Sequence, residues 1–327
     1  MKQKILFMCK IDDKNARQKI ERYYEVAEKD PADEKTILEN IRGMAGLVVP
    51  FTNNMLVTRR VIDAGTDLKI IGSSYGGTRQ NIEDIYALEK GLTVIHTGAS
   101  RPRPMAEYTL SLILSSLLQI HNYHHYMRSG EAWPRFKYGR TKILHKRTIG
   151  IIGLGQIGRE ICSLLKNFTS DISVRSSHLS TDDARELGVR KAELDEIFRT
   201  CEIIILSGGY TDQTHHMIGK KQFELMPENA LFVNIARGKM VNQEEMINVL
   251  AKKNIYLALD VFENEPLEEN SPLRNNDRVL LTPHRANNSI EFEERWQCLA
   301  DEFELYFQGK NPLSALTIER ARVMSES

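Results

Sequence analysis

The chain of 327 residues carries 44 basic and 44 acidic side chains, so its formal net charge is zero. A balanced charge supplies no field that would recruit nucleic acid or an anionic membrane, and we expect neither as a partner. The length exceeds what one ordinary core needs and indicates two domains. Four scattered cysteines without CxxC spacing indicate reduced thiols in a cytoplasmic protein. No apolar run has the length of a signal peptide core or a membrane span.

The first hundred residues alternate short apolar runs with polar segments of helical composition. We expect strands at 4–9, 46–49, 68–71 and 93–96, which together indicate a small α/β unit. The proline-rich stretch 100–104 then precedes an apolar helix that runs from Met105 to about Ile120, because proline is favoured just inside a helix start. With the segment 286–289, this stretch predicts a hinge between two domains.

From residue 148 onward the alternation of strands and helices resumes. A charged amphipathic helix at 290–308 ends the pattern, which indicates a doubly wound parallel sheet. The expected strands of this second half are 148–152, 171–176, 202–207, 230–235, 255–260 and 278–282, and helices are expected at 159–165 and 244–253.

A glycine fingerprint lies between the first of these strands and its helix. It reads Gly153-Leu154-Gly155-Gln156-Ile157-Gly158. The first glycine permits a tight turn, the second lets the backbone approach a pyrophosphate, and the third allows close helix packing. The N-terminus of the helix then faces the phosphates. We therefore expect Gly153, Gly155, Gln156, Ile157 and Gly158 to bind a dinucleotide, although an isolated GxGxxG also occurs in ordinary turns.

Three polar residues, Arg237, Asp260 and His284, each close a later apolar run. Ligands of open α/β sheets collect at the carboxyl ends of strands. A dinucleotide-dependent redox site needs a proton donor, a cation for an anionic substrate and a positioned nicotinamide. His284 is suited to be the proton donor, and Glu265 is suited to orient its ring. Arg237 is suited to be the cation. Taken singly, these residues are equally typical of a loop, a turn or a helix cap; their joint occurrence favours a catalytic site.

The runs 232–238, 258–266 and 281–284, with 105–110 and the fingerprint, closely resemble the signature segments of the D-isomer-specific 2-hydroxyacid dehydrogenases. The resemblance implies an α/β protein with two doubly wound domains. A flavodoxin-like substrate domain would comprise 1–100 and 287–327, and a Rossmann nucleotide-binding domain would comprise 101–286.

The resemblance also implies NAD(P)H-dependent reduction of a 2-oxo acid to a D-2-hydroxy acid, or the reverse oxidation. Arg237, Glu265 and His284 would be catalytic, Ala236 would lie at the cofactor, and Asp260 would hold the nicotinamide carboxamide. The apolar helix beginning at Met105 would help to form a homodimer through the nucleotide-binding domain; a wholly internal helix is the alternative.

The loop Ser74-Tyr75-Gly76-Gly77 follows a predicted strand of the first domain. Exposed backbone N–H groups in such a loop can bind a carboxylate, and the family uses its corresponding loop in this way. We expect these four residues to bind substrate, with Tyr75 as a specificity residue. The alternative is an ordinary glycine turn.

The end of the second nucleotide-domain strand departs from the family pattern. NAD-preferring members carry an acid there, whereas this chain has Arg175-Ser176-Ser177-His178. Small hydroxyls flanked by Arg175 and His178 could accommodate a 2′-phosphate, so we expect NADP as the preferred cofactor, with NAD as the alternative. If Arg175 points away, the chain would accept both.

A second departure is Arg285, which follows the histidine where family members usually have a small or apolar residue. Arg79, Arg101 and Arg103 add cations near the predicted substrate loop and hinge. Our hypothesis is that the substrate is a dianionic 2-oxo acid whose second anionic group binds these arginines. The alternative is that the arginines make surface or interdomain contacts. The segment 207–211 also departs from the family, and the sequence assigns it no function.

Two other functions remain open at this point. A nucleotide-sensing binding protein of the corepressor type shares this fold, and a formate- or phosphite-type dehydrogenase would use the same scaffold. We expect no metal, because the histidines show no ligand spacing, and the adjacent pairs 124–125 and 215–216 are more typical of solvated side chains.

Overall fold

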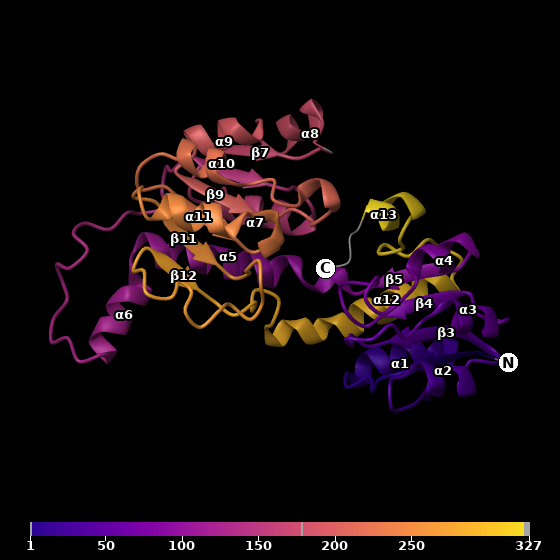
Figure 1. Cartoon of the computed structure of the whole chain (residues 1–327). Coiled ribbons are helices and arrows are strands. Elements are labelled where there is room, and N and C mark those ends of the chain that lie inside the picture. Colours follow the sequence, from indigo (N-terminus) through magenta and orange to yellow (C-terminus); the bar gives the residue numbers. More distant parts are fainter. Residues whose placement is uncertain (1, 178, 324–327) are drawn as a thin grey trace. The chain divides into compact units, whose positions relative to one another are not determined.

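The computed structural model describes residues 2–177 and 179–323 (Figure 1). The chain forms two compact units. Unit 1 comprises Met1–Arg101 and Ile290–Ser327, and unit 2 comprises Pro102–Ser289. Each unit has its own sheet and its own core.

Unit 1 contains a five-stranded parallel sheet in the order β2-β1-β3-β4-β5. This is the flavodoxin-like order that the sequence predicts. The strands are β1 Gln3–Phe7, β2 Tyr24–Glu28, β3 Met44–Val49, β4 Ile70–Ser73 and β5 Thr93–His96.

Helices cover both faces of this sheet because its central strands are apolar on both sides. One face packs on α1 (Lys14–Tyr23) and α12 (Arg295–Phe307), with Trp296 fully buried. The other face packs on α2, α3 and α4. The remaining elements of unit 1 are α2 Glu34–Asn40, α3 Arg59–Ala64, α4 Asp84–Glu89, η1 Gly98–Ser100, η4 Ile290–Glu294 and α13 Ile318–Val323.

Two local expectations for unit 1 were wrong. The edge strand β2 was not predicted, because it follows α1 without a turn and its sequence YEVAE is half polar. An edge strand buries little surface, so its apolar signal is weak. The expected helix 290–308 begins instead with the 3₁₀ turn η4, and α12 starts only at Arg295.

Unit 2 contains a seven-stranded parallel sheet in the order β12-β11-β10-β9-β6-β7-β8. Counted from β6, this is the Rossmann order 3-2-1-4-5-6 with one further strand, and the order reverses between β6 and β9. The strands are β6 Ile149–Ile152, β7 Ile172–Arg175, β8 Arg190–Lys191, β9 Ile203–Leu206, β10 Leu231–Asn234, β11 Tyr256–Leu259 and β12 Val279–Leu281.

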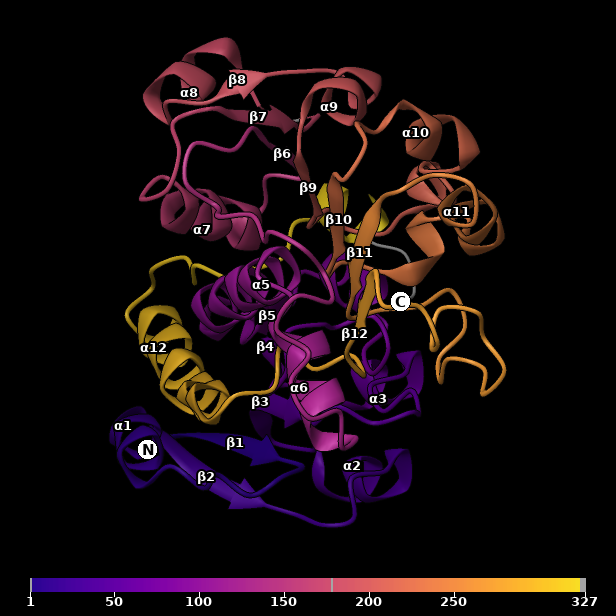
Figure 2. The ribbon, with the colours of Figure 1, turned by 90° about the vertical axis from the view of Figure 1, so that its left-hand side faces the viewer.

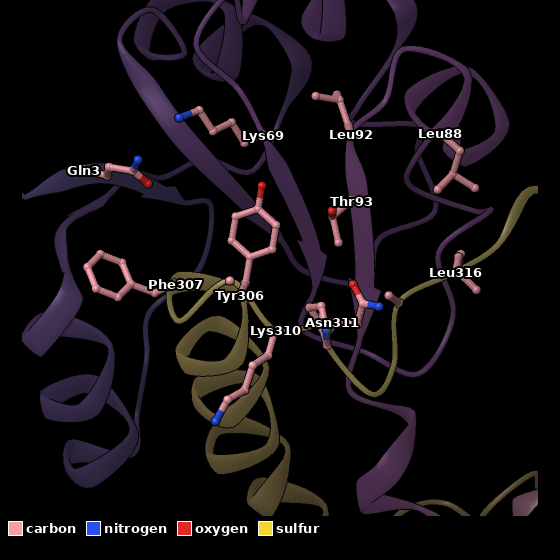
Figure 3. A pocket seen from close by; sticks show the side chains of 13 residues that line it. Gln3, Lys69, Leu88, Leu92, Thr93, Tyr306, Phe307, Lys310, Asn311 and Leu316 are labelled. Atoms are coloured by element: carbon pink, nitrogen blue, oxygen red, sulfur yellow. The ribbon is translucent and has the colours of Figure 1, made fainter.

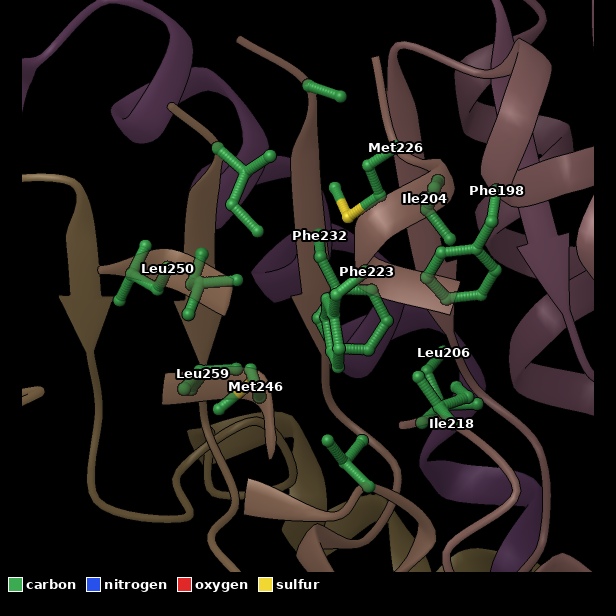
Figure 4. Close-up of a cluster of buried hydrophobic side chains, with 14 of the residues drawn as sticks. Phe198, Ile204, Leu206, Ile218, Phe223, Met226, Phe232, Met246, Leu250 and Leu259 are labelled. Carbon is green, nitrogen blue, oxygen red and sulfur yellow. The ribbon is translucent and has the colours of Figure 1, made fainter. Parts of the chain in front are cut away.

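Figure 2 shows the helices of unit 2 on the two faces of its sheet. The helices α5, α7 and α8 pack on one face, and α9, α10 and α11 pack on the other. On the second face Phe198, Phe223 and Phe232 form an aromatic centre with ring centroids 5.2 to 6.0 Å apart (Figure 4). The helices are α5 Pro102–Leu117, α6 Ile120–Arg128, α7 Gln156–Leu165, α8 Thr181–Glu186, α9 Leu194–Thr200, α10 Lys220–Leu225 and α11 Gln243–Leu250, with the 3₁₀ turns η2 Asp212–Thr214 and η3 Gly238–Met240.

The predicted apolar helix of unit 2 ends sooner than expected. It is interrupted at Gln119, whose φ is 56°, and continues as α6. Figure 1 shows α6 and the segment 129–146 projecting from the rest of unit 2. Several large apolar side chains are exposed here, namely Ile120, Met127, Trp133, Phe136 and Ile143. Across the described part of the chain, no helix has the length and apolar character needed to span a membrane.

Candidate active site

The glycine fingerprint forms the turn between β6 and α7, beside the point where the strand order of unit 2 reverses. Gly153 has φ +97°, and a Cβ there would lie 2.3 Å from the Cα of Gly208. A Cβ on Gly158 would lie 2.3 Å from the carbonyl oxygen of Gly153. These two glycines are therefore required by backbone geometry and by close packing.

Neither backbone geometry nor protein packing requires a glycine at position 155. Its φ of −75° suits any residue, and an added Cβ would meet no described atom within 4 Å. Of the chain's 20 glycines, only Gly77, Gly155 and Gly209 combine an unexceptional φ with open space among the described residues. All three lie in loops at the carboxyl ends of strands, where ligands of α/β sheets bind. Close approach of a ligand explains them where protein packing does not.

The segment after β9, to which the sequence assigns no function, packs on the fingerprint. The hydroxyl of Ser207 donates a hydrogen bond to the carbonyl oxygen of Gly153 at 2.9 Å, and the Ser207 N–H donates to Ile152. Gly208 fills the space that a side chain at Gly153 would need. Ser207 and Gly208 thus fix the fingerprint turn.

The end of β7 lies next to the fingerprint, because Arg175 pairs with Ile152 and accepts a hydrogen bond from the Gly153 N–H at 2.9 Å. Arg175 and Ser176 are half-buried and Ser177 is exposed. His178 lies outside the described residues. The three described residues are therefore at the edge of the sheet where the adenosine ribose of a dinucleotide binds in Rossmann folds.

Arg237 follows β10 in a turn that Asn234 closes. The buried Asn234 side chain accepts a hydrogen bond from the Ala236 N–H at 3.0 Å and donates to the Arg237 carbonyl oxygen at 3.2 Å. The Arg237 guanidinium donates to the Ala236 carbonyl at 2.8 Å. Asn234 therefore positions the Arg237 turn. The sequence analysis did not single it out, because its side-chain hydrogen bonds to other described residues lie within this turn.

Asp260 is fully buried at the end of β11 and binds the loop that carries His284. One carboxylate oxygen accepts hydrogen bonds from the Thr282 hydroxyl at 2.7 Å and the Arg285 N–H at 2.8 Å. The other accepts from the Ala286 N–H at 2.9 Å. Beside this group, burial raises the pKa of Tyr108, and the Asp260 charge adds to the rise. Asp260 therefore shapes the 282–286 loop; its contact with a nicotinamide stays a prediction.

His284 and Glu265 meet across this loop, with Nδ1 of the imidazole 2.7 Å from the Glu265 Oε2. Glu265 Oε1 accepts a hydrogen bond from the Phe262 N–H at 3.0 Å. His284 has φ +51°, and its N–H donates to the carbonyl oxygens of Asp260 and Thr282 at 2.8 and 3.1 Å. These bonds hold a histidine in the sparsely populated left-handed region, as at many functional sites.

The segment 262–265 connects the pair to Arg237. A Cβ on Gly238, the residue after Arg237, would lie 1.8 Å from the carbonyl carbon of Phe262, so the two backbones are in direct contact. The described contacts of unit 2 therefore bring Arg237, Glu265 and His284 onto neighbouring loops at one edge of one sheet.

The predicted substrate loop follows β4 in unit 1. Ser74 is buried and its N–H donates to the Val49 carbonyl, whereas Tyr75 and Gly76 are half-buried. The guanidinium carbon of Arg101 lies 4.1 Å from the Tyr75 ring centroid, and a Cβ on Gly76 would lie 2.4 Å from it. Arg101 thus stacks on the loop by a cation–π contact. Phe51, 46% exposed, lies 4.8 Å from Tyr75 between ring centroids and adds an aromatic surface that the sequence analysis missed.

Two of the four arginines considered for substrate binding are held by other groups. Arg79 pairs with the buried Asp84 at 3.2 Å and donates to the Ala321 carbonyl. Arg103 pairs with Glu107 at 2.6 Å and Glu160 at 3.1 Å. Arg103 therefore makes surface contacts, whereas Arg79 is held inside unit 1 by the buried Asp84.

Unit 1 has a hollow that is lined in part by the end of α12 (Figure 3). Gln3, Lys69 and Thr93, which line it, stand at the starts of β1, β4 and β5, whereas the substrate loop follows the end of β4. The hollow and the loop are therefore at opposite edges of the same sheet. Among the described residues, no group of three or more His, Cys, Asp or Glu side chains is placed to hold a metal.

A Rossmann sheet with a glycine fingerprint and a histidine–carboxylate pair is typical of nicotinamide-dependent oxidoreductases, and comparison with known proteins gives the family. Residues 110–286 match the NAD binding domain of the D-isomer specific 2-hydroxyacid dehydrogenases. A Staphylococcus haemolyticus protein, named provisionally as a 2-hydroxyacid dehydrogenase, is 34% identical over 263 residues, which are 79% of this chain and 81% of that protein. The chain belongs to the D-isomer specific 2-hydroxyacid dehydrogenase family.

Solved structures share the fold. The apo D-mandelate dehydrogenase of Rhodotorula graminis has a TM-score of 0.86 at 19% identity, over 97% of this chain and 98% of that one. The PH0520 protein of Pyrococcus horikoshii has a TM-score of 0.80 at 24% identity over the whole of both chains. The protein is thus a nicotinamide-dependent oxidoreductase of the 2-hydroxyacid dehydrogenase class, and neither a corepressor nor a formate-type enzyme is favoured.

Proposed function

We propose that the protein reduces a dianionic 2-oxo acid to the D-2-hydroxy acid with NADPH as the preferred cofactor. The observation that carries the assignment of the catalytic residues is the 2.7 Å contact between His284 Nδ1 and Glu265 Oε2, in the unit that holds the fingerprint. Nδ1 is engaged by the carboxylate, so Nε2 is the ring nitrogen that delivers a proton to the substrate.

Three side chains of unit 2 act on the substrate, namely Arg237, His284 and Glu265. The Arg237 guanidinium binds the carboxylate or carbonyl oxygen of the 2-oxo acid in a planar fork. His284 gives its Nε2 proton to the carbonyl oxygen as negative charge develops there, and Glu265 stabilises the imidazolium. When bound, the reduced nicotinamide supplies the hydride. In the substrate loop, the N–H groups of Gly76 and Gly77 bind the carboxylate. The N–H groups of Ser74 and Tyr75 donate instead to the Val49 carbonyl and the Ser73 hydroxyl, so these two residues hold the loop in shape.

The cofactor is held by the fingerprint and by the α7 N-terminus. Gly155 gives the pyrophosphate close access to the backbone, and the N–H groups of Gln156 and Ile157 are oriented toward it. Ala236 and Asp260 lie at the nicotinamide end, and Arg175, Ser176 and Ser177 at the adenosine end. Because that end offers a cation and hydroxyls in place of a carboxylate, it suits a 2′-phosphate.

Two arginines support the dianionic substrate. Arg285 follows His284 and is exposed, and its backbone is fixed by Asp260. Arg101 is stacked against Tyr75 and Gly76 of the substrate loop. A second carboxylate, a phosphate or a phosphonate on the 2-oxo acid is a group that a guanidinium of this kind binds.

We also propose that the chain forms a homodimer through unit 2 and resides in the cytoplasm. Trp133 and Phe136 are 72% and 81% exposed on the projection that follows α6, and aromatic side chains so exposed are typical of interfaces. All four cysteines are free thiols, which suits a reducing compartment.

The test is the loss of NADPH and, in parallel, NADH absorbance with glyoxylate, hydroxypyruvate, pyruvate, 2-oxoglutarate, oxaloacetate and phosphonopyruvate, on the wild type and on Arg285→Ala. We expect the highest kcat/KM with NADPH and a dianionic acid, and a loss in the variant of about tenfold for dianionic acids only. A preference for glyoxylate with NADH would refute both the cofactor and the substrate proposals. An unchanged ratio between mono- and dianionic acids in the variant would refute the role of Arg285.

A further inference from the structure

A second imidazole–carboxylate pair lies beside the first. The Nε2 of His216 is 2.6 Å from the Oε1 of Glu263. The other oxygen of Glu263 accepts a hydrogen bond from the Gln243 N–H at 3.0 Å, and the Glu263 N–H donates to the Gln243 side chain at 3.2 Å. Glu263 is thus fixed at three atoms, between the start of α11 and His216. The sequence analysis predicted a solvated His216 in place of a metal ligand; the side chain is 33% exposed, and its contact with Glu263 was not foreseen.

Both carboxylates belong to the segment 262–265. Glu265 is two residues from Glu263 and is itself bonded to the Phe262 N–H. The Gly238 backbone packs directly against the peptide between Phe262 and Glu263. A shift of Glu263 would therefore move Glu265 and disturb the turn that carries Arg237.

His216 also ends the segment that fixes the fingerprint. That segment begins at Ser207, which bonds to Gly153. It is cross-linked internally, because Thr214 accepts from the Thr211 N–H at 2.8 Å and donates to the Gly209 carbonyl at 3.3 Å. The ring of His215 stacks on that of His216 with centroids 4.0 Å apart. His216 itself has φ +48°. One cross-linked segment thus joins the fingerprint to Glu263.

We propose that His216 is a positioning residue for the reduction, which acts through Glu263 to place Glu265 against His284. The inference rests on the proposed role of the His284–Glu265 pair. His216 touches neither substrate nor cofactor in this scheme. Its Nε2 proton holds Glu263, Glu263 holds the segment 262–265, and this segment sets the distance between Glu265 and His284.

The test compares His216→Gln with His216→Leu. Both substitutions place a non-glycine residue without a β-branch at φ +48°, so the backbone strain is matched, but only glutamine has an N–H at the reach of Nε2. We expect the leucine variant to lower kcat about tenfold and the glutamine variant to retain at least about half, since small misplacements of catalytic groups are costly. The KM for the cofactor and the melting temperature should agree between the two variants.

A double variant separates positioning from general support of the fold. In the Glu265→Ala background, His216→Leu should lower kcat no further, because the side chain that it positions is already absent. The same tenfold loss in both backgrounds, or equal activity of the leucine and glutamine variants, would overturn the inference and leave the proposed function intact. Full activity of Glu265→Gln alone would refute the proposed acid–base pair, and the inference with it.

Discussion

The carboxylate of Glu265 is bonded at both oxygens, with Oε2 2.7 Å from His284 Nδ1 and Oε1 3.0 Å from the Phe262 N–H. The second bond fixes the carboxylate whatever the charge on the imidazole, so the proposed transfer of the Nε2 proton would need no reorganisation of Glu265. A histidine held in this way at φ +51° is constrained both in its ring and in its backbone.

Substitution of the proton donor His284 should lower kcat more than substitution of Glu265. We expect His284→Asn to lower kcat about 10²- to 10⁴-fold and Glu265→Gln to lower it about 10- to 100-fold, because the amide keeps a hydrogen bond but no charge. Cofactor affinity, measured by NADPH fluorescence, should stay within about twofold, because neither residue is expected at the phosphates. His145→Gln, an exposed histidine of unit 2, is the matched control. Activity of His284→Asn equal to that of the control would rule out His284 as the acid.

Substitution of two fingerprint glycines should affect cofactor binding and stability separately. Gly155→Ala meets no described atom, so we expect the free energy of unfolding to change by about 1 kcal/mol or less, while the Kd for the cofactor rises at least about tenfold. Gly158→Ala brings a methyl group within 2.3 Å of the Gly153 carbonyl and should destabilise unit 2 by about 1–3 kcal/mol. Urea unfolding and fluorescence titration measure the two effects. Equal cofactor affinity of Gly155→Ala and the wild type would contradict the ligand explanation.

Gly77→Ala is the counterpart in the substrate loop. The new methyl group again meets no described atom, so the fold should be unaffected. We expect the KM for the 2-oxo acid to rise about tenfold and the Kd for the cofactor to stay unchanged, because a Cβ would obstruct a carboxylate at the backbone N–H groups. Steady-state kinetics with either reduced cofactor measures the change. An unaltered KM would indicate that the loop is an ordinary turn.

The fold was predictable where short apolar runs alternate with helical segments, because burial on both faces of a parallel sheet leaves a strong local signal. The fingerprint and the residues Arg237, Asp260 and His284 were found for the same reason, since each closes such a run. The contact of His216 with Glu263 joins positions 47 apart and leaves no local pattern. Ser207 is likewise visible only in three dimensions, because its partner Gly153 is 54 positions away.

The end of β7 should determine cofactor choice. Arg175→Ala should lower kcat/KM for NADPH about tenfold and leave that for NADH unchanged, because only the 2′-phosphate would pair with the guanidinium. Ser176→Asp should reverse the preference, since a carboxylate there repels the phosphate and accepts a bond from a ribose hydroxyl. Arg185→Ala, which removes an exposed arginine on α8, is the control. A parallel loss with both cofactors in Arg175→Ala would show that Arg175 does not discriminate.

The stability of unit 1 should fall in acid because of His96. This side chain is only 8% exposed, and its Nδ1 accepts a hydrogen bond from the Gly98 N–H at 3.0 Å. Burial, with the charges of Arg320 and Arg101, lowers the pKa of His96 to about 4 from its ordinary value of 6.5. Because the folded pKa is the lower one, the unfolded chain binds more protons between these pH values. Stability is therefore full above pH 6.5 and declines as the pH falls toward 4.

Between pH 7 and pH 5 this single group should remove about 2 kcal/mol from the free energy of unfolding. His96→Asn keeps a side-chain oxygen as acceptor for the Gly98 N–H and does not titrate. The free energy of unfolding that this variant loses between pH 7 and pH 5 should therefore be smaller by about 2 kcal/mol. Urea unfolding at the two pH values, followed by Trp296 fluorescence in a Trp133→Phe background, measures unit 1, since the chain has only these two tryptophans. If the variant and its parent lose the same free energy between pH 7 and pH 5, His96 is not the group responsible.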